Sequence, residues 1–169
     1  MRRVIGVMGS GTAEHAELAE PLGGWLAEQG FDLLTGGGGG VMAAVCRGFH
    51  GVPVRTGITV GILPAGPPPG YPNRWIELAI HTHLPARGEE GASERSRNHL
   101  NVLSSHVLVA LPGSAGTRTE VELALCYRRP LIAYLGPAGV IAGLAREQLP
   151  AVANSLAEVQ EFIHRCLSG

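Results

Sequence analysis

Short apolar runs alternate along the chain with longer segments in which apolar residues recur every three or four positions. The first pattern is typical of buried β-strands and the second of amphipathic helices. The predicted strands are Val4–Met8, Phe31–Leu34, Ile58–Leu63, Trp75–His81, Val107–Leu111 and Leu131–Leu135. The predicted helices are Ala13–Gln29, Val41–Phe49, Glu94–Leu103, Thr117–Tyr127 and Ser155–Leu167. Strand and helix patterns therefore alternate through most of the chain.

Strands that are apolar throughout and alternate with helices are typical of a parallel sheet covered on both faces. We therefore predict an α/β fold over residues 1–169, a single nucleotide-binding domain with a doubly wound, mostly parallel, Rossmann-like sheet and helices on both faces. The length of 169 residues lies within the usual range of one domain. Ligands of such sheets bind beyond the carboxyl ends of the strands, so the turns there are the expected place for a site.

Glycine-rich turns follow three of the predicted strands and lead into predicted helices. The first N–H groups of a helix lack intrahelical partners and carry the positive end of the helix dipole, so a phosphate can dock there where no side chain blocks it. The turns therefore predict a nucleotide site. The residues expected to contact phosphate or nucleotide are Gly9, Ser10, Gly11, Gly37, Gly38, Gly39, Gly40, Pro112, Gly113, Ser114, Ala115, Gly116 and Thr117.

The run from Gly36 to Gly40 has a second interpretation, a tight turn with close helix packing. The turn after the first strand is not a dinucleotide fingerprint, because Glu14 stands at the third glycine position of G-x-G-x-x-G. The acidic residue of that fingerprint is also missing, since Asp32 begins the second strand instead of following it. The chain contains no lysine, which argues against P-loop phosphoryl transfer.

The turn after Leu111 resembles the P-G-G-x-G-T-x-x-E signature of the LONELY GUY (LOG) group. Residues 112–120 read P-G-S-A-G-T-R-T-E, so Ser114 replaces the second glycine and Arg118 adds a cation. Upstream, residues 96–98 read S-R-N, where the group has an E-R-K or S-R-N helix start, and residues 37–42 are similar to its glycine turn. The resemblance runs from about Val4 to Leu135 and is greatest to the molybdenum-cofactor-carrier-like branch of the LOG superfamily.

The resemblance implies a ligand and two alternative functions. Enzymes of the LOG group cleave the N-glycosidic bond of a nucleoside 5'-monophosphate without a cofactor, which implies catalytic roles for Arg97 and Glu120. A carboxylate can stabilise the oxocarbenium-like state of that reaction, and an arginine beside it keeps it ionised and holds sugar or phosphate oxygens. Thr82, Asn98 and Arg118 are possible further substrate contacts. The alternative is a non-catalytic carrier for molybdenum cofactor (molybdopterin cofactor) or another phosphorylated pterin.

The two catalytic candidates also have simpler interpretations. Glu120 lies near a predicted helix start, where a carboxylate stabilises the helix by about 0.3–1 kcal/mol with no further role. Arg97 has Arg87 and Arg95 nearby and could instead be a surface arginine, although its spacing to Glu120 favours a functional role. Both interpretations stay open at this point.

Other residues give weaker signals. His81 and His83 would share one face of a strand, but no third histidine or cysteine stands at a ligand-like spacing, so no metal site is predicted. Residues 64–72 include five prolines and are expected to form a lid, a subunit contact or an exposed stiff loop. Cys126 is expected to be a small core residue.

Composition narrows the possible partners to small molecules and further copies of the chain. The net charge is -1, from 13 basic and 14 acidic residues, so no positive field is available for nucleic acid. No apolar run is long enough to be a signal peptide or a membrane span. Three widely spaced cysteines suit a reducing cytoplasm. The family resemblance implies a homodimer or homotetramer.

Overall fold

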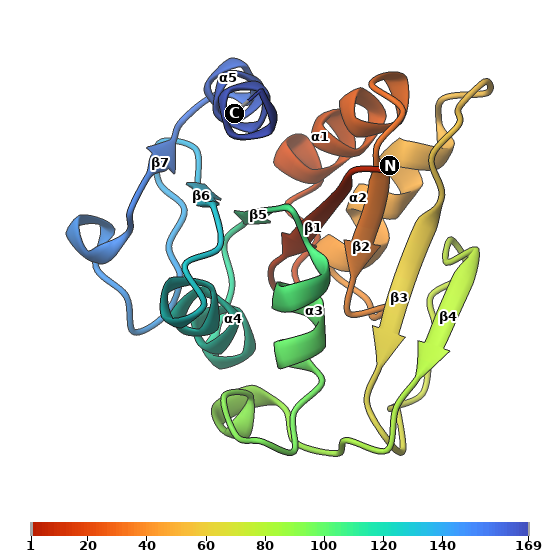
Figure 1. Cartoon of the computed structure of the whole chain (residues 1–169), viewed down its shortest axis with the longest axis vertical. Coiled ribbons are helices and arrows are strands. Elements are labelled where there is room, and N and C mark those ends of the chain that lie inside the picture. Colours follow the sequence, from red (N-terminus) through yellow and green to blue (C-terminus); the bar gives the residue numbers. More distant parts are fainter. Residues whose placement is uncertain (1, 169) are drawn as a thin grey trace.

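The computed structural model describes residues 2–168, which contain a seven-stranded, all-parallel sheet (Figure 1). The strands, in the order β4-β3-β2-β1-β5-β6-β7, are covered by helices on both faces. The predicted Rossmann-like α/β fold is confirmed. The strands are β1 (Val4–Met8), β2 (Asp32–Thr35), β3 (Thr59–Leu63), β4 (Leu78–His81), β5 (Val107–Ala110), β6 (Leu131–Tyr134) and β7 (Val152–Ala153). The helices are α1 (Ala16–Glu28), α2 (Val41–His50), α3 (Asn98–Ser104), α4 (Ala115–Cys126) and α5 (Leu156–Leu167), with short 3₁₀ turns η1 (Gly88–Glu90) and η2 (Arg146–Gln148).

Two hydrophobic cores lie on the two faces of the sheet. In β5, Val107 and Val109 pack into the core shared with α1, α2 and α5. Their neighbours Leu108 and Ala110 pack into the core shared with α3 and α4. All four side chains are fully buried, which is why this strand is apolar at every position.

Helices α1 and α2 approach each other at backbone distance. A Cβ atom placed on Gly23 would lie 2.0 Å from the Val45 carbonyl oxygen, and one on Gly48 would lie 2.1 Å from the Glu20 carbonyl oxygen. Only glycine fits at either position. By contrast, a Cβ atom on Gly24, one residue further along α1, would meet its nearest neighbour at 3.7 Å.

Some predicted boundaries are wrong because local hydrogen bonds end the regular pattern. The helix predicted from Glu94 begins at Asn98, since the chain before it pairs elsewhere: the Ala86 N–H donates to the Arg95 carbonyl. The helix predicted from Ala13 begins at Ala16, because the Ser10 hydroxyl oxygen accepts the N–H groups of residues 12 and 13. The predicted helix from Thr117 begins two residues earlier, and β7 was not predicted.

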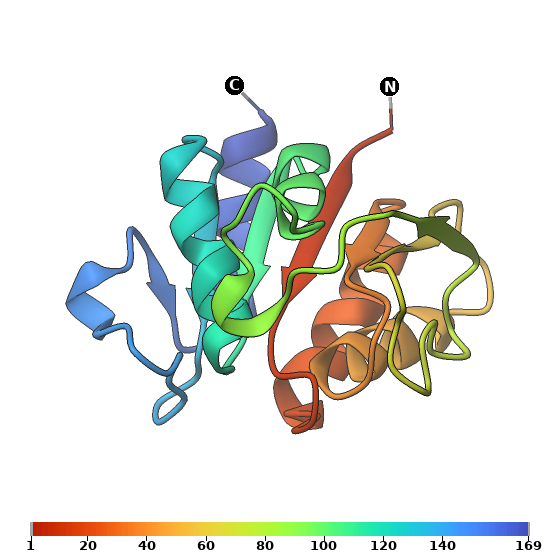
Figure 2. The same ribbon diagram turned by 90° about the horizontal axis from the view of Figure 1, so that it is seen from below.

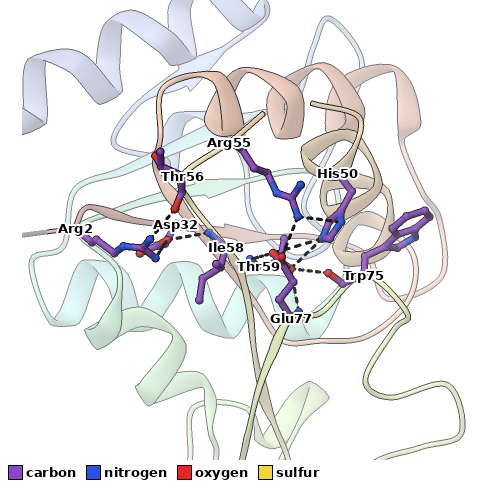
Figure 3. A network of polar contacts seen from close by, with 9 residues as sticks. All are labelled: Arg2, Asp32, His50, Arg55, Thr56, Ile58, Thr59, Trp75 and Glu77. Carbon is purple, nitrogen blue, oxygen red and sulfur yellow. Dashed lines mark hydrogen bonds and ion pairs between the residues drawn. The ribbon is translucent and has the colours of Figure 1, made fainter. Parts of the chain in front are cut away.

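A polar network joins β3, β4 and α2 at the amino ends of the two strands (Figure 3). The segment between β3 and β4 contains no helix, so β4 depends on contacts of this kind. The Glu77 carboxylate accepts hydrogen bonds from the Thr59 N–H at 3.0 Å and from Arg55 at 2.9 Å, and it lies 3.6 Å from His50. Burial works to raise the pKa of Glu77, but these donors and positive charges hold it below its ordinary value. The network therefore holds the edge strand β4 in place at its amino end. The carboxyl ends of the strands, where ligands are expected, lie at the opposite edge of the sheet.

Two further observations bear on the expectations from sequence. Cys126 is exposed at the end of α4, so its prediction as a core residue was wrong. Within residues 2–168, no helix has both the length and the apolar character needed to cross a membrane.

Candidate functional site

A cavity of about 290 Å³ opens at the carboxyl ends of β1 and β5. These two strands are neighbours at the centre of the sheet. The strands β2 to β4 lie on one side of β1, and β5 to β7 lie on the other, so the strand order reverses between β1 and β5. This reversal is the switch point at which doubly wound sheets bind ligands. The lining residues are Met8, Gly9, Gly11, Met42, Pro64, Tyr71, Arg87, Gly88, Arg97, Asn98, Ser114, Gly116, Thr117 and Glu120.

The start of α4 forms one wall of the cavity. Ser114 precedes the helix, and the first intrahelical bond runs from the Arg118 N–H to the Ser114 carbonyl at 2.9 Å. The N–H groups of residues 115–117 therefore precede the first bond of the helix. A Cβ atom on Gly116 would meet nothing within 4 Å, so the space beside this backbone is open. A small anion can approach these amides closely.

The turns after β1 and β5 touch each other. The Ser10 N–H donates to the Pro112 carbonyl at 3.0 Å. At Gly113 a Cβ atom would lie 2.1 Å from the Thr117 hydroxyl oxygen, and 3.0 Å from the Ser10 nitrogen. Glycine at position 113 is therefore required for the two turns and the first turn of α4 to meet at one point.

Arg97 is buried against the floor of the cavity, so its interpretation as a surface arginine was wrong. Its Nε donates to the Ile62 carbonyl at 2.9 Å, and its guanidinium also bonds the side-chain oxygen of Asn98. A Cβ atom at Gly36 would lie 2.6 Å from the guanidinium. Because Gly36 has no side chain, it leaves room for the Arg97 guanidinium.

Glu120 is the buried carboxyl group of the cavity, with 8% of its surface exposed. The Asn101 side-chain amide donates to it at 3.0 Å. Burial raises the pKa of Glu120, and the Arg97 charge and the Asn101 hydrogen bond oppose that rise. Since α4 begins at Ala115, Glu120 lies in its second turn, beyond the reach of a helix-start charge interaction. Its interpretation as a simple helix-start carboxylate therefore fails, whereas Glu122 lies on the exposed side of α4.

The glycine run 37–40 packs against the site without lining it. A Cβ atom at Gly38 would lie 2.2 Å from the Tyr71 hydroxyl, and Gly40, with φ 57°, would meet the Ser10 carbonyl at 2.3 Å. Asn73 binds this run through its backbone N–H to the Gly37 carbonyl and its side-chain amide to Gly38, both at 2.8 Å. Close packing thus accounts for these glycines and positions Tyr71 beside the cavity.

Several other candidate residues lie outside the lining. The Thr82 hydroxyl donates to the Leu63 carbonyl at 2.8 Å, and Arg118 pairs with Glu89 and Glu122. Ser10, Pro112 and Gly113 line a neighbouring hollow together with Ser114, and Ala115 lines neither. Of the residues named from sequence, the cavity brings together Gly9, Gly11, Arg97, Asn98, Ser114, Gly116, Thr117 and Glu120.

Two loops line the cavity with residues that were not among the site residues expected from sequence. Pro64 and Tyr71 belong to the proline-rich loop, and Arg87 and Gly88 belong to the segment that runs from β4 to η1 beside α4 (Figure 2). Arg87 is exposed and has no ion-pair partner within residues 2–168. The only sequence signal for these walls was the proline-rich composition of the first loop.

The fold and the cavity together define an α/β protein with a cavity at the topological switch point of its sheet. Helix-start amides, an arginine and a buried carboxyl group line this cavity. The chain belongs to the SLOG cluster4 family, whose model matches residues 2–163.

Similar proteins span essentially the whole chain. An uncharacterized protein of Archaeoglobus fulgidus is 30% identical over 97% of this chain and 94% of its own length. The molybdenum cofactor binding protein from Rippkaea orientalis has a TM-score of 0.76 and 29% identity over 99% of this chain and 98% of that one. The molybdenum cofactor carrier protein from Chlamydomonas reinhardtii has a TM-score of 0.73 and 30% identity, with complete coverage of both chains.

Proposed function

We propose that the protein binds and carries molybdenum cofactor or another phosphorylated pterin in the cavity at the β1–β5 switch point. The observation that carries the proposal is that α4 start amides, Arg97 and Glu120 line one cavity. Two similar structures, from Rippkaea orientalis and Chlamydomonas reinhardtii, belong to proteins described as binding or carrying this cofactor.

The phosphate of the ligand would lie at the start of α4. The amides of Ala115, Gly116 and Thr117 and the Thr117 hydroxyl are donors of the kind that bind phosphate oxygens, and the helix dipole favours an anion there. Arg97 adds a fixed positive charge with N–H groups in a planar fork. Its two bonds to the protein hold the guanidinium in place before any ligand arrives.

The ring system would extend from the phosphate toward Glu120. A pterin presents ring and amino N–H groups, and a carboxylate is a strong acceptor for such donors. Met8, Met42 and Tyr71 supply apolar surface for the ring faces. The cavity volume of about 290 Å³ is at the lower end of the range for ligand pockets. The cavity therefore has room for a phosphate and one ring system, and the remainder of the ligand would lie in its opening.

The test is the ligand that the purified protein retains. The protein, produced in cells that synthesise the cofactor, is denatured and its released pterin is oxidised and measured by fluorescence. We expect pterin in near-equal ratio to protein for the wild type and its loss in Gly116→Ala, which fills the open space beside the α4 amides. Wild-type protein without bound pterin, which also takes up none from a supplied cofactor preparation, would overturn the proposal.

A second candidate function is hydrolysis of a nucleoside 5'-monophosphate to its base and ribose 5-phosphate. The observation that favours it is that Glu120 and Arg97 lie in the same cavity as the α4 amides, so a carboxylate would face the sugar of a nucleotide whose phosphate is bound there. Purified protein is incubated with AMP and free adenine is quantified. Release by the wild type that Glu120→Gln abolishes would support hydrolysis, and equal release from both would reject it.

The protein would also form a homodimer or homotetramer through the outer face of α3 and α4. Leu100, Leu103 and Tyr127 are exposed there, whereas their neighbour Val102 is buried in the core of its own chain. Light scattering is expected to give an oligomer for the wild type and a monomer for Leu103→Glu. The control Val54→Glu, at a residue 90% exposed outside this face, should keep the wild-type mass. A monomeric wild type would contradict the expectation.

A further inference from the structure

Two additional hollows continue the cavity along the carboxyl ends of β5 and β6. One, of about 370 Å³, is lined by Ser10, Thr12 and Ser114 among others. The next, of about 420 Å³, is lined mainly by apolar groups that include Leu18 and Pro137. His15, Pro112, Ala138 and Gly139 line both hollows, which therefore form one groove. The proposed function uses none of this groove.

Ser114 is the residue that the cavity and the groove have in common. It stands where the signature of the resembling group has glycine, so this chain adds a hydroxyl at the junction. Ser114 is exposed, and its side chain makes no capping hydrogen bond to α4. On the other side of the junction, Gly9 and Gly11 face the cavity while Ser10 and Thr12 face the groove. The anion position at the start of α4 therefore opens on two sides.

We propose that the groove is a second subsite, which binds a nucleoside joined to the ligand's phosphate through a second phosphate. The inference rests on the proposed function, because the first phosphate is the one held by the α4 amides. The full ligand would then be a phosphorylated pterin extended by a nucleotide. The Ser114 hydroxyl would donate to the diphosphate where it crosses the junction.

The groove has the chemistry of a nucleoside subsite. Its entrance is polar, with the hydroxyls of Ser10 and Thr12, which suits a phosphate and a ribose. Its far end is mainly apolar, with Leu18 and Pro137 beside the exposed carboxylate of Glu17, which suits the faces and the amino group of a base. His15 has φ 43° at the start of α1, a left-handed conformation that is uncommon for residues other than glycine. The groove thus changes from polar to apolar in the order that a nucleotide does.

The experiment compares inorganic phosphate with ADP by calorimetry and by backbone amide NMR on the 17.6 kDa chain. ADP carries a terminal phosphate for the α4 site and a nucleoside beyond a second phosphate. We expect ADP to bind at least tenfold more tightly than phosphate. Phosphate should shift the amide signals of residues 115–117 alone, and ADP should also shift those of His15, Ala138 and Gly139.

Variants test the location of the nucleoside. Ala138→Trp fills the groove and should reduce ADP affinity to that of phosphate while leaving phosphate affinity unchanged. Ala157→Trp, on an exposed position of α5, is the matched control and should change neither. If phosphate binds but ADP binds no more tightly, or if Ala138→Trp leaves ADP affinity intact, the nucleoside subsite is wrong and the proposed function stands. If phosphate itself does not bind to the start of α4, both are wrong.

Discussion

Gly116→Ala separates phosphate binding from folding. A Cβ atom at Gly116 would meet no atom within 4 Å, so the folded protein accommodates the methyl group without strain. Alanine is the better helix former, and the variant should be as stable as the wild type or more stable by up to about 1 kcal/mol. The same methyl group would occupy the space through which an anion reaches the amides at the start of α4.

The expected loss of affinity follows from the hydrogen bonds that the methyl group blocks. A hydrogen bond to a charged group contributes about 1.5–3 kcal/mol, so losing one weakens phosphate binding by about 10- to 150-fold. The assay is a calorimetric titration with inorganic phosphate, together with urea denaturation of the same preparation. Gly24→Ala is the control, because it is also a helical glycine with an ordinary nearest contact of 3.7 Å. If Gly116→Ala folds and binds phosphate as the wild type does, the anion does not lie at the start of α4.

Three further substitutions test the charges of the site and the packing of α1 against α2. Relative to the wild type, Glu120→Gln should gain stability as the pH rises above the ordinary carboxyl value, because burial raises the folded-state pKa of Glu120 and its ionisation then opposes folding. Urea denaturation of both proteins from acidic to neutral pH measures this change, and a stability difference that stays constant with pH would contradict it. Gly23→Ala should lose about 1–3 kcal/mol of unfolding free energy or more, because its Cβ atom would lie 2.0 Å from the Val45 carbonyl oxygen, whereas Gly24→Ala should lose none. Arg97→Met removes the donor to the Ile62 carbonyl and to the Asn98 side-chain oxygen, and each buried acceptor left without a donor should lower the unfolding free energy by about 1–3 kcal/mol. Urea denaturation measures this loss, and a midpoint equal to that of the wild type would show that both acceptors find other partners.

The sheet could be predicted from sequence because its strands are buried on both faces. Runs such as Val107–Leu111 are apolar at every position, and glycine-rich turns mark where they end. The prediction missed β7 because Val152–Ala153 is too short to show a pattern. It extended β4 back to Trp75 because the turn at Asn73, whose side-chain oxygen accepts the Trp75 N–H at 3.0 Å, leaves no mark in hydropathy.

The part of the site that follows the strands could also be predicted, whereas the walls contributed by loops could not. Ser114, Gly116 and Thr117 follow β5 directly, so knowledge of the sheet suffices to bring them to its carboxyl edge. Tyr71 and Arg87 reach the cavity through long-range contacts, such as the bond from Asn73 to the glycine run, which no local spacing encodes. The glycine run indicated that another group approaches its backbone closely. It did not indicate whether that group is a ligand or a side chain of the protein, such as Tyr71 at Gly38.

The carboxyl group of Glu120 connects the two candidate functions. Burial makes its ionised form unfavourable, and the Arg97 charge and the Asn101 hydrogen bond only partly offset this cost. A ligand that donates hydrogen bonds to the carboxylate offsets that cost, and both a pterin ring and a ribose can do so. The two differ in what they need from it: a carrier needs only an acceptor, which the amide of glutamine partly supplies, whereas hydrolysis needs a negative charge beside the sugar. Retained ligand binding in Glu120→Gln together with absent turnover in the wild type would therefore assign the residue to recognition, and turnover that disappears with the charge would assign it to catalysis.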